Sequence, residues 1–157
     1  MSRSAVTPAP VVKNHRVAEI SWAAVRASEP DFGTLATLRL GLQELDRFSE
    51  TVSREHGCTA SMFQLLLAVK TARRGRGLDI GMLATSLRVR HPSAAEMARK
   101  AQSSGFLAAS VDPDDGRRVL LSLTDHGEQT IDSLAHAHVE ELRRRRAGFV
   151  AALNALT

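Results

Sequence analysis

Two short apolar stripes with the same spacing, separated by only a few residues, constrain the fold of this chain more than any other feature. Apolar residues recur at positions i, i+3, i+4 and i+7 over residues 80–87, and the same spacing returns over residues 94–101. Each stripe is typical of one face of an amphipathic helix. Because residues 88–91 leave room only for a sharp turn, the two helices must cross and share a core. This arrangement is a helix-turn-helix, whose second helix is the usual reader of a DNA major groove.

A hairpin with a charged tip follows the second helix. Residues 107–111 and 118–123 are predicted strands on either side of a Pro-Asp-Asp-Gly segment, which is strong turn chemistry. Arg117 and Arg118 come directly after the turn, where an arginine would reach a phosphate or a narrow minor groove. Asp115 is placed to orient Arg117 through a charge-assisted hydrogen bond. The hairpin and the two helices together predict a winged helix.

The second helix must bury one face on its own protein and offer polar groups on the other. Arg90, His91 and Ser93 stand near its N-terminus and would approach base edges first, by the usual docking geometry. Arg90 would pair with guanine in bidentate fashion, worth ~1–3 kcal/mol of discrimination. Glu96 would accept a hydrogen bond from cytosine or hold a neighbouring cation in place. The predicted DNA-binding residues are Arg88, Arg90, His91, Ser93, Lys100, Asp115, Arg117 and Arg118.

The composition favours a polyanionic partner and argues against several other functions. A formal charge of +4 and a pI near 10.2 suit a protein that neutralises phosphates. Five Phe, one Trp and no Tyr supply too few rings to stack single-stranded nucleic acid. The single cysteine excludes an internal disulfide framework and suits a reducing cytoplasm. Because no membrane span, catalytic constellation or cofactor motif stands out, we expect a cytoplasmic protein that is not an enzyme and needs no cofactor.

Further helices are predicted on both sides of the winged helix. Residues 1–30 carry prolines and small polar residues and are predicted to form a partly disordered extension. Residues 31–56 and 125–157 are predicted to be helical, because apolar residues recur along both at helical spacing, which suits packing against another helix. Gly148 is expected to end the long helix of the last segment and leave a short one after it. The winged helix-turn-helix DNA-binding domain then occupies residues 57–124, in a mainly α fold (α+β) with one small β-hairpin wing.

These residues resemble the MarR family of bacterial winged helix-turn-helix transcription regulators over roughly residues 31–157. The most specific parts are Ile80-Gly-Met-Leu-Ala-Thr-Ser-Leu87, His91-Pro-Ser-Ala94, Gly105-Phe-Leu107 and Asp112-Pro-Asp-Asp-Gly-Arg-Arg-Val-Leu-Leu-Ser-Leu-Thr124. The strongest single match is the last segment, with Asp115 and Arg117 in the wing-tip pattern and a Leu-Thr-x-x-Gly ending at Gly127.

The resemblance implies a homodimer whose first and last helices interlock, so that residues 31–56 and 125–157 would be the dimerisation helices. Family members bind pseudo-palindromic operators in double-stranded DNA, usually as repressors. Many let go when a small phenolic or aromatic ligand occupies a cleft between the dimerisation helices and the winged helix. Arg99 stands where related sequences often carry an acid, and Gly116 stands where the wing commonly has another arginine. These two departures bear on the base and groove contacts and not on the fold.

Several residues invite a second interpretation. Cys58 would suit a redox-sensing regulator, but sensors of the family carry their cysteine near the start of the chain, and a buried apolar role fits this position better. Trp22, on a short helix predicted over residues 16–27, is a weak candidate for a ligand contact beside a plain packing role. His136 and His138 lie two apart and do not share a helix face, so no metal site is predicted. A winged helix that binds proteins without DNA contact is the alternative function.

Overall fold

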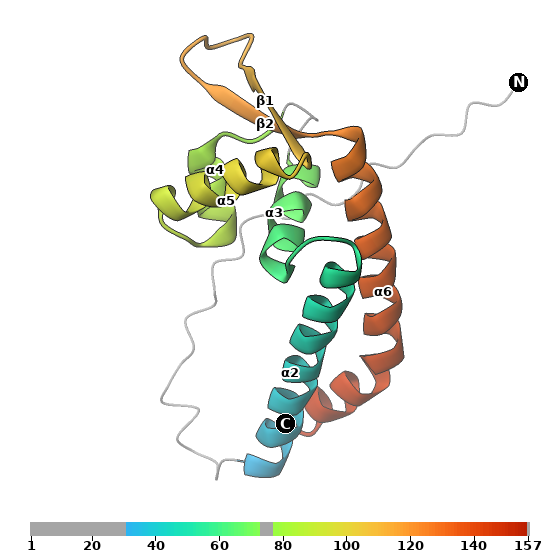
Figure 1. The fold of residues 1–157 in the computed structure, drawn as a ribbon. Helices are drawn as coiled ribbons and strands as arrows, with labels where there is room; N and C mark the ends of the chain where they lie inside the picture. The colour runs from blue at the N-terminus through green and yellow to red at the C-terminus, as the bar shows by residue number, and fades with distance from the viewer. Residues whose placement is uncertain (1–30, 73–76, 157) are drawn as a thin grey trace, which may run out of the picture. The chain divides into compact units, whose positions relative to one another are not determined.

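The computed structural model describes residues 31–72 and 77–156, which form five helices and a two-stranded hairpin (Figure 1). The helices are α2 (Phe32–Glu55), α3 (Ala60–Lys70), α4 (Ile80–Leu87), α5 (His91–Ser103) and α6 (Asp125–Asn154). The strands β1 (Leu107–Val111) and β2 (Val119–Leu123) pair antiparallel. Contacts between residues group the helices and the hairpin into one compact unit. The predicted mainly α fold with a hairpin wing is confirmed.

Helix α3 is the centre of the core. It contacts α4, α5, α6 and β2, and its Leu65 and Leu66 are fully buried. Leu83 of α4 and Leu134 of α6 belong to the same cluster and are also fully buried. Burying such a side chain contributes about 1.5–3 kcal/mol relative to leaving it exposed. Thr59 starts the helix by accepting a hydrogen bond from the third helical amide at 3.1 Å, so the central helix has both a fixed start and a buried body.

Helices α4 and α5 form the predicted helix-turn-helix. The buried residues are Leu83 and Ala84 on α4 and Ala94, Ala98 and Ala101 on α5, which confirms both apolar stripes. Three small residues on one face of α5 let the two helices approach closely. The polar face of α5 is thereby turned away from the core.

The turn between α4 and α5 is closed by backbone hydrogen bonds. Arg88 ends α4 in the left-handed region with φ 54°. The Val89 amide then donates to the Ala84 carbonyl at 3.1 Å. Because a non-glycine residue in this conformation costs roughly 1–2 kcal/mol, packing between the two helices must hold the turn. The sequence predicted the turn but not its left-handed residue.

The wing is attached to the segment that leads into α4. Leu78 forms an isolated bridge with Leu121 of β2 through two backbone hydrogen bonds of 3.0 and 2.8 Å. Gly77 has φ +85°, and a Cβ there would lie 2.4 Å from the Leu121 carbonyl oxygen, so the close approach requires glycine. Strand β2 begins at Val119, one residue later than predicted. The hairpin is therefore fixed to the helix-turn-helix at its base.

Helix α6 runs without interruption from Asp125 to Asn154, so the predicted helix end at Gly148 is wrong. The ribbon of α6 bends near its C-terminal end but continues as a helix (Figure 1). A single glycine inside a helix costs only about 1 kcal/mol relative to alanine. Packing of the neighbouring residues of α6 on α2 outweighs that cost. The ring of Phe149, the residue after Gly148, lies against Gly41 of α2, with a ring carbon 3.1 Å from the position that a Cβ on Gly41 would take.

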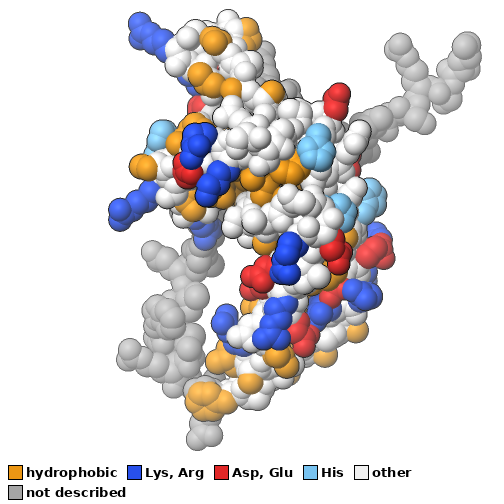
Figure 2. All heavy atoms as spheres, viewed as in Figure 1, with side chains coloured by type: hydrophobic (Ala, Val, Ile, Leu, Met, Phe, Trp, Pro, Cys, Tyr) orange, Lys and Arg blue, Asp and Glu red, His pale blue; other side chains and the backbone are white. Residues whose placement is uncertain are grey.

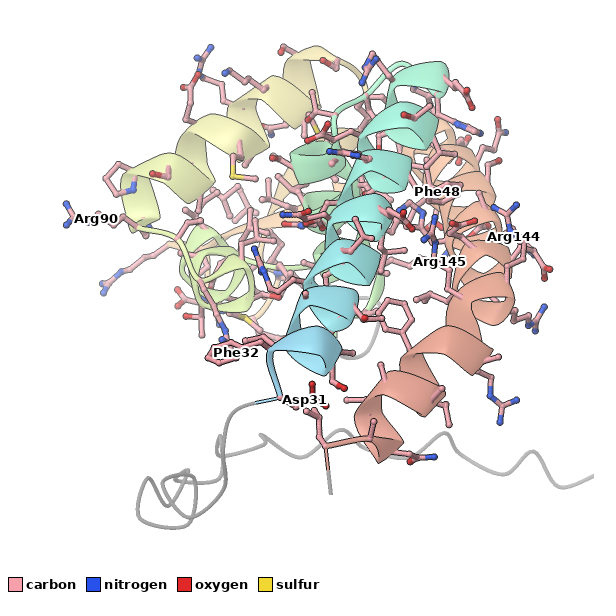
Figure 3. All side chains as sticks on the ribbon, turned by 90° about the horizontal axis from the view of Figure 1, so that it is seen from below. Asp31, Phe32, Phe48, Arg90, Arg144 and Arg145 are labelled. Atoms are coloured by element: carbon pink, nitrogen blue, oxygen red, sulfur yellow. The ribbon has the colours of Figure 1, made fainter. Side chains whose placement is uncertain are left out.

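Helices α2 and α6 contact each other through side chains. Phe48 meets the ring of His138 edge-on, with ring centroids 5.4 Å apart. Arg145 pairs with Glu44 of α2 and with Glu141 of its own helix. Figure 3 shows Phe48 and Arg145 between the two helices. Large apolar side chains nevertheless stay exposed on both helices: Leu35, Leu40 and Leu42 on α2, and Val139, Leu142, Val150 and Leu153 on α6.

Three predictions fall outside the described residues, namely the partly disordered extension over residues 1–30, the helix over residues 16–27 and the ligand contact of Trp22. The division into dimerisation helices and a DNA-binding domain stays a prediction. Among the helices that the structure describes, none is long and apolar enough to cross a membrane.

Candidate nucleic-acid interface

The exposed face of α5 presents side chains predicted to meet DNA. His91, Ser93 and Lys100 are all exposed, because the alanine stripe of α5 faces the core on the opposite side. The Lys100 side chain is 67% exposed. His91 and Ser93 stand in the first turn, where unpaired amides and the helix dipole favour a negatively charged group. This end of α5 therefore suits a phosphate or the electronegative edge of a base.

Three arginines near this face have guanidinium groups with no ion pair among the described residues 31–72 and 77–156. Arg88 and Arg90 lie in the turn between α4 and α5, Arg117 lies at the wing tip, and all are exposed. Figure 3 shows Arg90 at the outer end of α5, pointing away from the other helices. A free guanidinium offers paired donors that match a phosphate or the acceptor edge of guanine.

Lys and Arg side chains lie over two regions of the surface in view: over α2 and α6, where Asp and Glu side chains are mixed with them, and over the helix-turn-helix and the wing (Figure 2). Figure 2 shows Lys and Arg side chains at the tip of the hairpin and over helices α4 and α5. The hairpin tip and the α4–α5 turn are far apart in the sequence, and the pairing of Leu78 with β2 brings the wing to α4. A surface with cations at both places suits the phosphates of a duplex better than a single point charge would.

Glu96 is held by cations of its own helix. The Arg99 guanidinium donates to the Glu96 carboxylate at 3.0 and 2.6 Å. The Lys100 ammonium lies 3.8 Å from the same carboxylate. Because Arg99 stabilises the charged form, it holds the pKa of Glu96 below its usual range. Two roles were expected for Glu96, and the structure shows the second, in which it holds neighbouring cations. Glu96 pairs closely with Arg99 and only loosely with Lys100.

The tip of the wing is folded by its own aspartates. Asp112 accepts a hydrogen bond from the Asp114 amide at 3.0 Å, and Asp115 accepts one from the Arg117 amide at 3.1 Å. Side-chain bonds of this kind, two residues along the chain, stabilise a turn. Asp115 thus orients Arg117 by accepting a hydrogen bond from the Arg117 backbone amide. The sequence did not indicate which group of Arg117 would bind Asp115. The guanidinium of Arg117 stays available to a partner.

Arg118 has a different environment from its neighbour Arg117. Its guanidinium pairs with Asp79 and lies 3.8 Å from the Asp112 carboxylate. Asp79 also caps α4, because it accepts a hydrogen bond from the Met82 amide at 2.7 Å. That amide, followed by the Arg118 guanidinium, holds the pKa of Asp79 below its usual range. Arg118 was predicted to contact DNA, and the structure places it as a link between the wing and α4.

Asp79 was missing from the predicted interface. The two partners of the Asp79–Arg118 ion pair are 39 residues apart, so no local spacing indicates their contact. The one signal in the sequence was the position of an aspartate directly before the first apolar stripe, which is typical of a helix cap. That signal predicts the cap and not the ion pair.

Cys58 is buried, and His138 packs against a neighbouring ring. Burial raises the pKa of the Cys58 thiol, which is 9% exposed, and a higher pKa means less of the reactive thiolate. His138 stacks on Phe63 with ring centroids 4.0 Å apart. Among the described residues, no three His, Cys, Asp or Glu side chains are grouped so as to hold a metal ion. These observations favour the packing role that was weighed for Cys58.

The crossing helices and the attached hairpin define a winged helix-turn-helix protein. Its fold is that of the MarR-family transcription regulators, as the resemblance in the sequence indicated. AbsC, a MarR-family regulator from Streptomyces coelicolor, is similar with a TM-score of 0.61 and 20% identity, over 85% of this chain and 80% of that chain.

Two further solved structures share the fold and carry ligands. Staphylococcus aureus MepR in complex with DNA is similar with a TM-score of 0.60 and 18% identity, over 76% of this chain and 98% of that chain. CouR from Rhodococcus jostii, bound to p-coumaroyl-CoA, has a TM-score of 0.63 and 15% identity, over 74% of this chain and 81% of that chain. No family model matches the sequence, and no curated protein matches it. At these identities the likeness is one of fold.

Proposed function

We propose that this chain is a MarR-family transcription regulator that binds a pseudo-palindromic operator in double-stranded DNA. The observation that carries the proposal is the set of three exposed guanidinium groups of Arg88, Arg90 and Arg117, on the helix-turn-helix and the wing. Within residues 31–72 and 77–156, no carboxylate forms an ion pair with any of them. MepR, which shares the fold, was solved in a complex with DNA, and this supports a DNA-binding function for the present chain.

The predicted DNA-binding residues have two roles: some contact the DNA, and others hold the wing in position. Arg90, His91, Ser93 and Lys100 serve the major groove, because they stand on the exposed face of α5 or at its start. Arg117 serves the backbone or the minor groove from the wing tip, and Arg88 meets a phosphate beside the turn. Asp115 and Arg118 act indirectly, since they fix the wing tip and its attachment to α4.

A homodimer is the form that fits this operator. A two-fold symmetric protein places two α5 helices in successive major grooves, so the site repeats as a pseudo-palindrome. The exposed leucines of α2 and α6 supply an apolar surface for the second copy. Replacing Leu42 and Leu142, each about half exposed, by glutamate should leave the fold intact and yield a monomer in light scattering. A wild-type protein that is already monomeric at micromolar concentration would contradict the dimer.

Repression with release by a small aromatic ligand completes the proposal, in a cytoplasmic protein without catalytic activity. The structure of CouR bound to p-coumaroyl-CoA supports a ligand-responsive regulator of this fold. A repressor blocks transcription by occupying its operator. The sign of regulation is tested by transcription in vitro from a promoter that contains the bound site.

Salt titration of duplex binding tests the DNA-binding function. Several phosphate contacts demand a steep fall of affinity with salt, with a slope of about −0.9 per neutralised phosphate in a plot of log K against log salt concentration. Arg117→Ala should weaken binding to all sequences, whereas Arg90→Ala should relax specificity at one base position. Arg47→Ala on α2 is the matched control, because Arg47 is exposed and far in sequence from both the turn and the wing.

A winged helix that binds only proteins would give a different result. It would show weak duplex binding that Arg90→Ala and Arg117→Ala affect no more than Arg47→Ala does. Equal footprints for the wild type and both variants would also refute the assignment of the two arginines.

A further inference from the structure

Two valines on the wing are exposed where one face of the hairpin runs past the core. Leu107 and Leu121 lie on that face and are buried near the base of the hairpin. Because side chains alternate along a strand, Val111 and Val119 lie on the same face, nearer the tip, as direct cross-strand neighbours. Val111 is 61% exposed and Val119 is 50% exposed. Neither valine belongs to the core cluster formed by the described residues.

The valine pair is continuous with the surface proposed to meet DNA. Arg117 lies in the turn between the two strands, and its guanidinium forms no ion pair within residues 31–72 and 77–156. The nearby carboxylates of Asp112 and Asp115 accept hydrogen bonds from amides of the tip. Figure 1 shows the hairpin projecting beyond the helices, and Figure 2 shows hydrophobic side chains close to its tip. A partner that reaches Arg117 therefore comes close to the valines.

The minor groove of a duplex admits the tip of the wing but not its body. The groove is about 6 Å wide, whereas two paired strands lie about 4.8 Å apart before their side chains are added. When an arginine at the tip enters a narrow groove, the strands behind it lie over the sugars that border the groove. Deoxyribose presents C–H groups there and lacks the 2′-hydroxyl of ribose. An apolar face therefore suits the sugars of DNA.

The small size of the patch argues against a protein partner. A stable protein interface buries about 800 Å² on each side, and two valine side chains supply a small part of that area. Ala108 and Ser110, on the other face of β1, are small and do not extend the apolar surface. A pair of valines is instead matched in size by a pair of sugars.

We propose that Val111 and Val119 contact deoxyribose at the edge of the minor groove and thereby favour DNA over ribose-containing duplexes. This contact rests on the proposed function, because it deepens the DNA binding of the wing. Arg117 supplies the electrostatic part of the contact, which depends on released counterions. The valines supply an apolar part, which does not. The two parts therefore respond differently to salt.

The affinity of the full chain is measured by anisotropy with a labelled copy of the duplex that it selects from a random pool. Val111→Thr and Val119→Thr each exchange one methyl group for a hydroxyl and keep a β-branched residue. Each should weaken binding roughly fourfold, the equivalent of about 0.8 kcal/mol for one buried methyl group, with the salt slope unchanged. Arg117→Ala should instead lower the magnitude of the salt slope by about 0.9. Ser110→Thr is the matched control on the other face of β1 and should bind as the wild type does.

Larger apolar side chains should act in the opposite direction. Val111→Ile and Val119→Ile keep the hairpin and add a methylene, so they should tighten binding, which a mere loss of wing stability would not predict. Equal affinity for the threonine and isoleucine variants would overturn the contact, and valines that meet a protein would give this result. A salt slope lowered as much as in Arg117→Ala would also overturn it, because the whole wing would then have moved. A chain that binds no duplex refutes the proposed function as well, whereas a missing valine effect refutes the contact alone.

A ribonucleotide scan tests whether the contact is made to the sugar. Ribonucleotides replace deoxynucleotides one at a time through the selected site. Wild-type affinity should fall at the positions under the wing, because the added 2′-hydroxyl loses water against a methyl group. The loss should shrink in the double variant Val111→Thr/Val119→Thr, whose hydroxyls hydrogen-bond to the 2′-hydroxyl. Changes of duplex geometry are common to both proteins, so the difference between the scans isolates the contact. Identical scans at every position would overturn the proposal.

Discussion

Replacing Arg90 by serine should stabilise the protein and weaken its DNA binding at the same time. Arg90 is the N-cap residue of α5, with extended φ −71° and ψ 149°, and its side chain makes no capping hydrogen bond. A serine there would accept from the Ser93 amide, because Pro92 has no amide hydrogen to donate. A new side-chain cap is worth ~0.5–2 kcal/mol, typically about 1 kcal/mol. That gain raises the melting temperature by roughly 3–5 °C for a unit of this size.

The DNA affinity of Arg90→Ser should move in the opposite direction. Loss of a bidentate pair with guanine costs ~1–3 kcal/mol of discrimination at one base position. Urea unfolding measures the first effect, and fluorescence anisotropy with a labelled duplex measures the second. Arg47→Gln removes the same charge from α2 and should leave the DNA affinity unchanged. A destabilised Arg90→Ser variant would refute the cap, and unchanged binding and specificity would refute the base contact.

Three further results follow from the packing and the titratable groups. Gly127→Ala should destabilise the protein by about 1–3 kcal/mol in urea unfolding, because its Cβ would lie 2.1 Å from the Phe106 carbonyl oxygen; Gly116→Ala, with nothing within 4 Å, should have no effect. The lowered pKa of Asp79 stabilises the folded protein at pH values above the ordinary aspartate pKa of about 4, and this stabilisation is lost as the pH falls through the folded pKa. Asp79→Ser should therefore lose less stability than the wild type does when the pH falls below about 4. A pH profile of the urea midpoint that is the same for the variant and the wild type would contradict this. Peroxide should leave Cys58 a thiol in intact mass spectra and DNA binding unaltered, because its thiol is buried; an added oxygen accompanied by lost binding would restore the sensor hypothesis.

The helix-turn-helix and the wing were predictable because their signals are local. Apolar residues at helical spacing fix which face of α4 and α5 is buried, and a four-residue gap leaves only a sharp turn. Asp and Gly between two β-prone runs specify a hairpin without reference to the rest of the chain. The prediction that a helix ends at Gly148 was wrong because it too relied on a local signal alone. A glycine weakens a helix by a known small amount, and whether the helix continues depends on packing such as that of Phe149 on Gly41.

The parts of the site that could not be predicted depend on long-range contacts. Asp79 and Arg118 meet only because Leu78 pairs with β2, which brings the wing back to the start of α4. The neutralisation of Arg118 by Asp79 distinguishes it from Arg117, although the two are identical neighbours in the sequence.

Selection of sites from a random pool of duplex DNA by the full chain tests the central claim most directly. A dimeric reader should enrich a pseudo-palindrome whose two half-sites lie one helical turn apart, about 10 base pairs centre to centre. Arg90→Ala should relax the enriched sequence at one symmetric pair of positions while Arg47→Ala reproduces the wild-type site. A pool that shows no enriched sequence, or an enriched site without two-fold symmetry, would contradict a dimeric reader that places one α5 in each half-site.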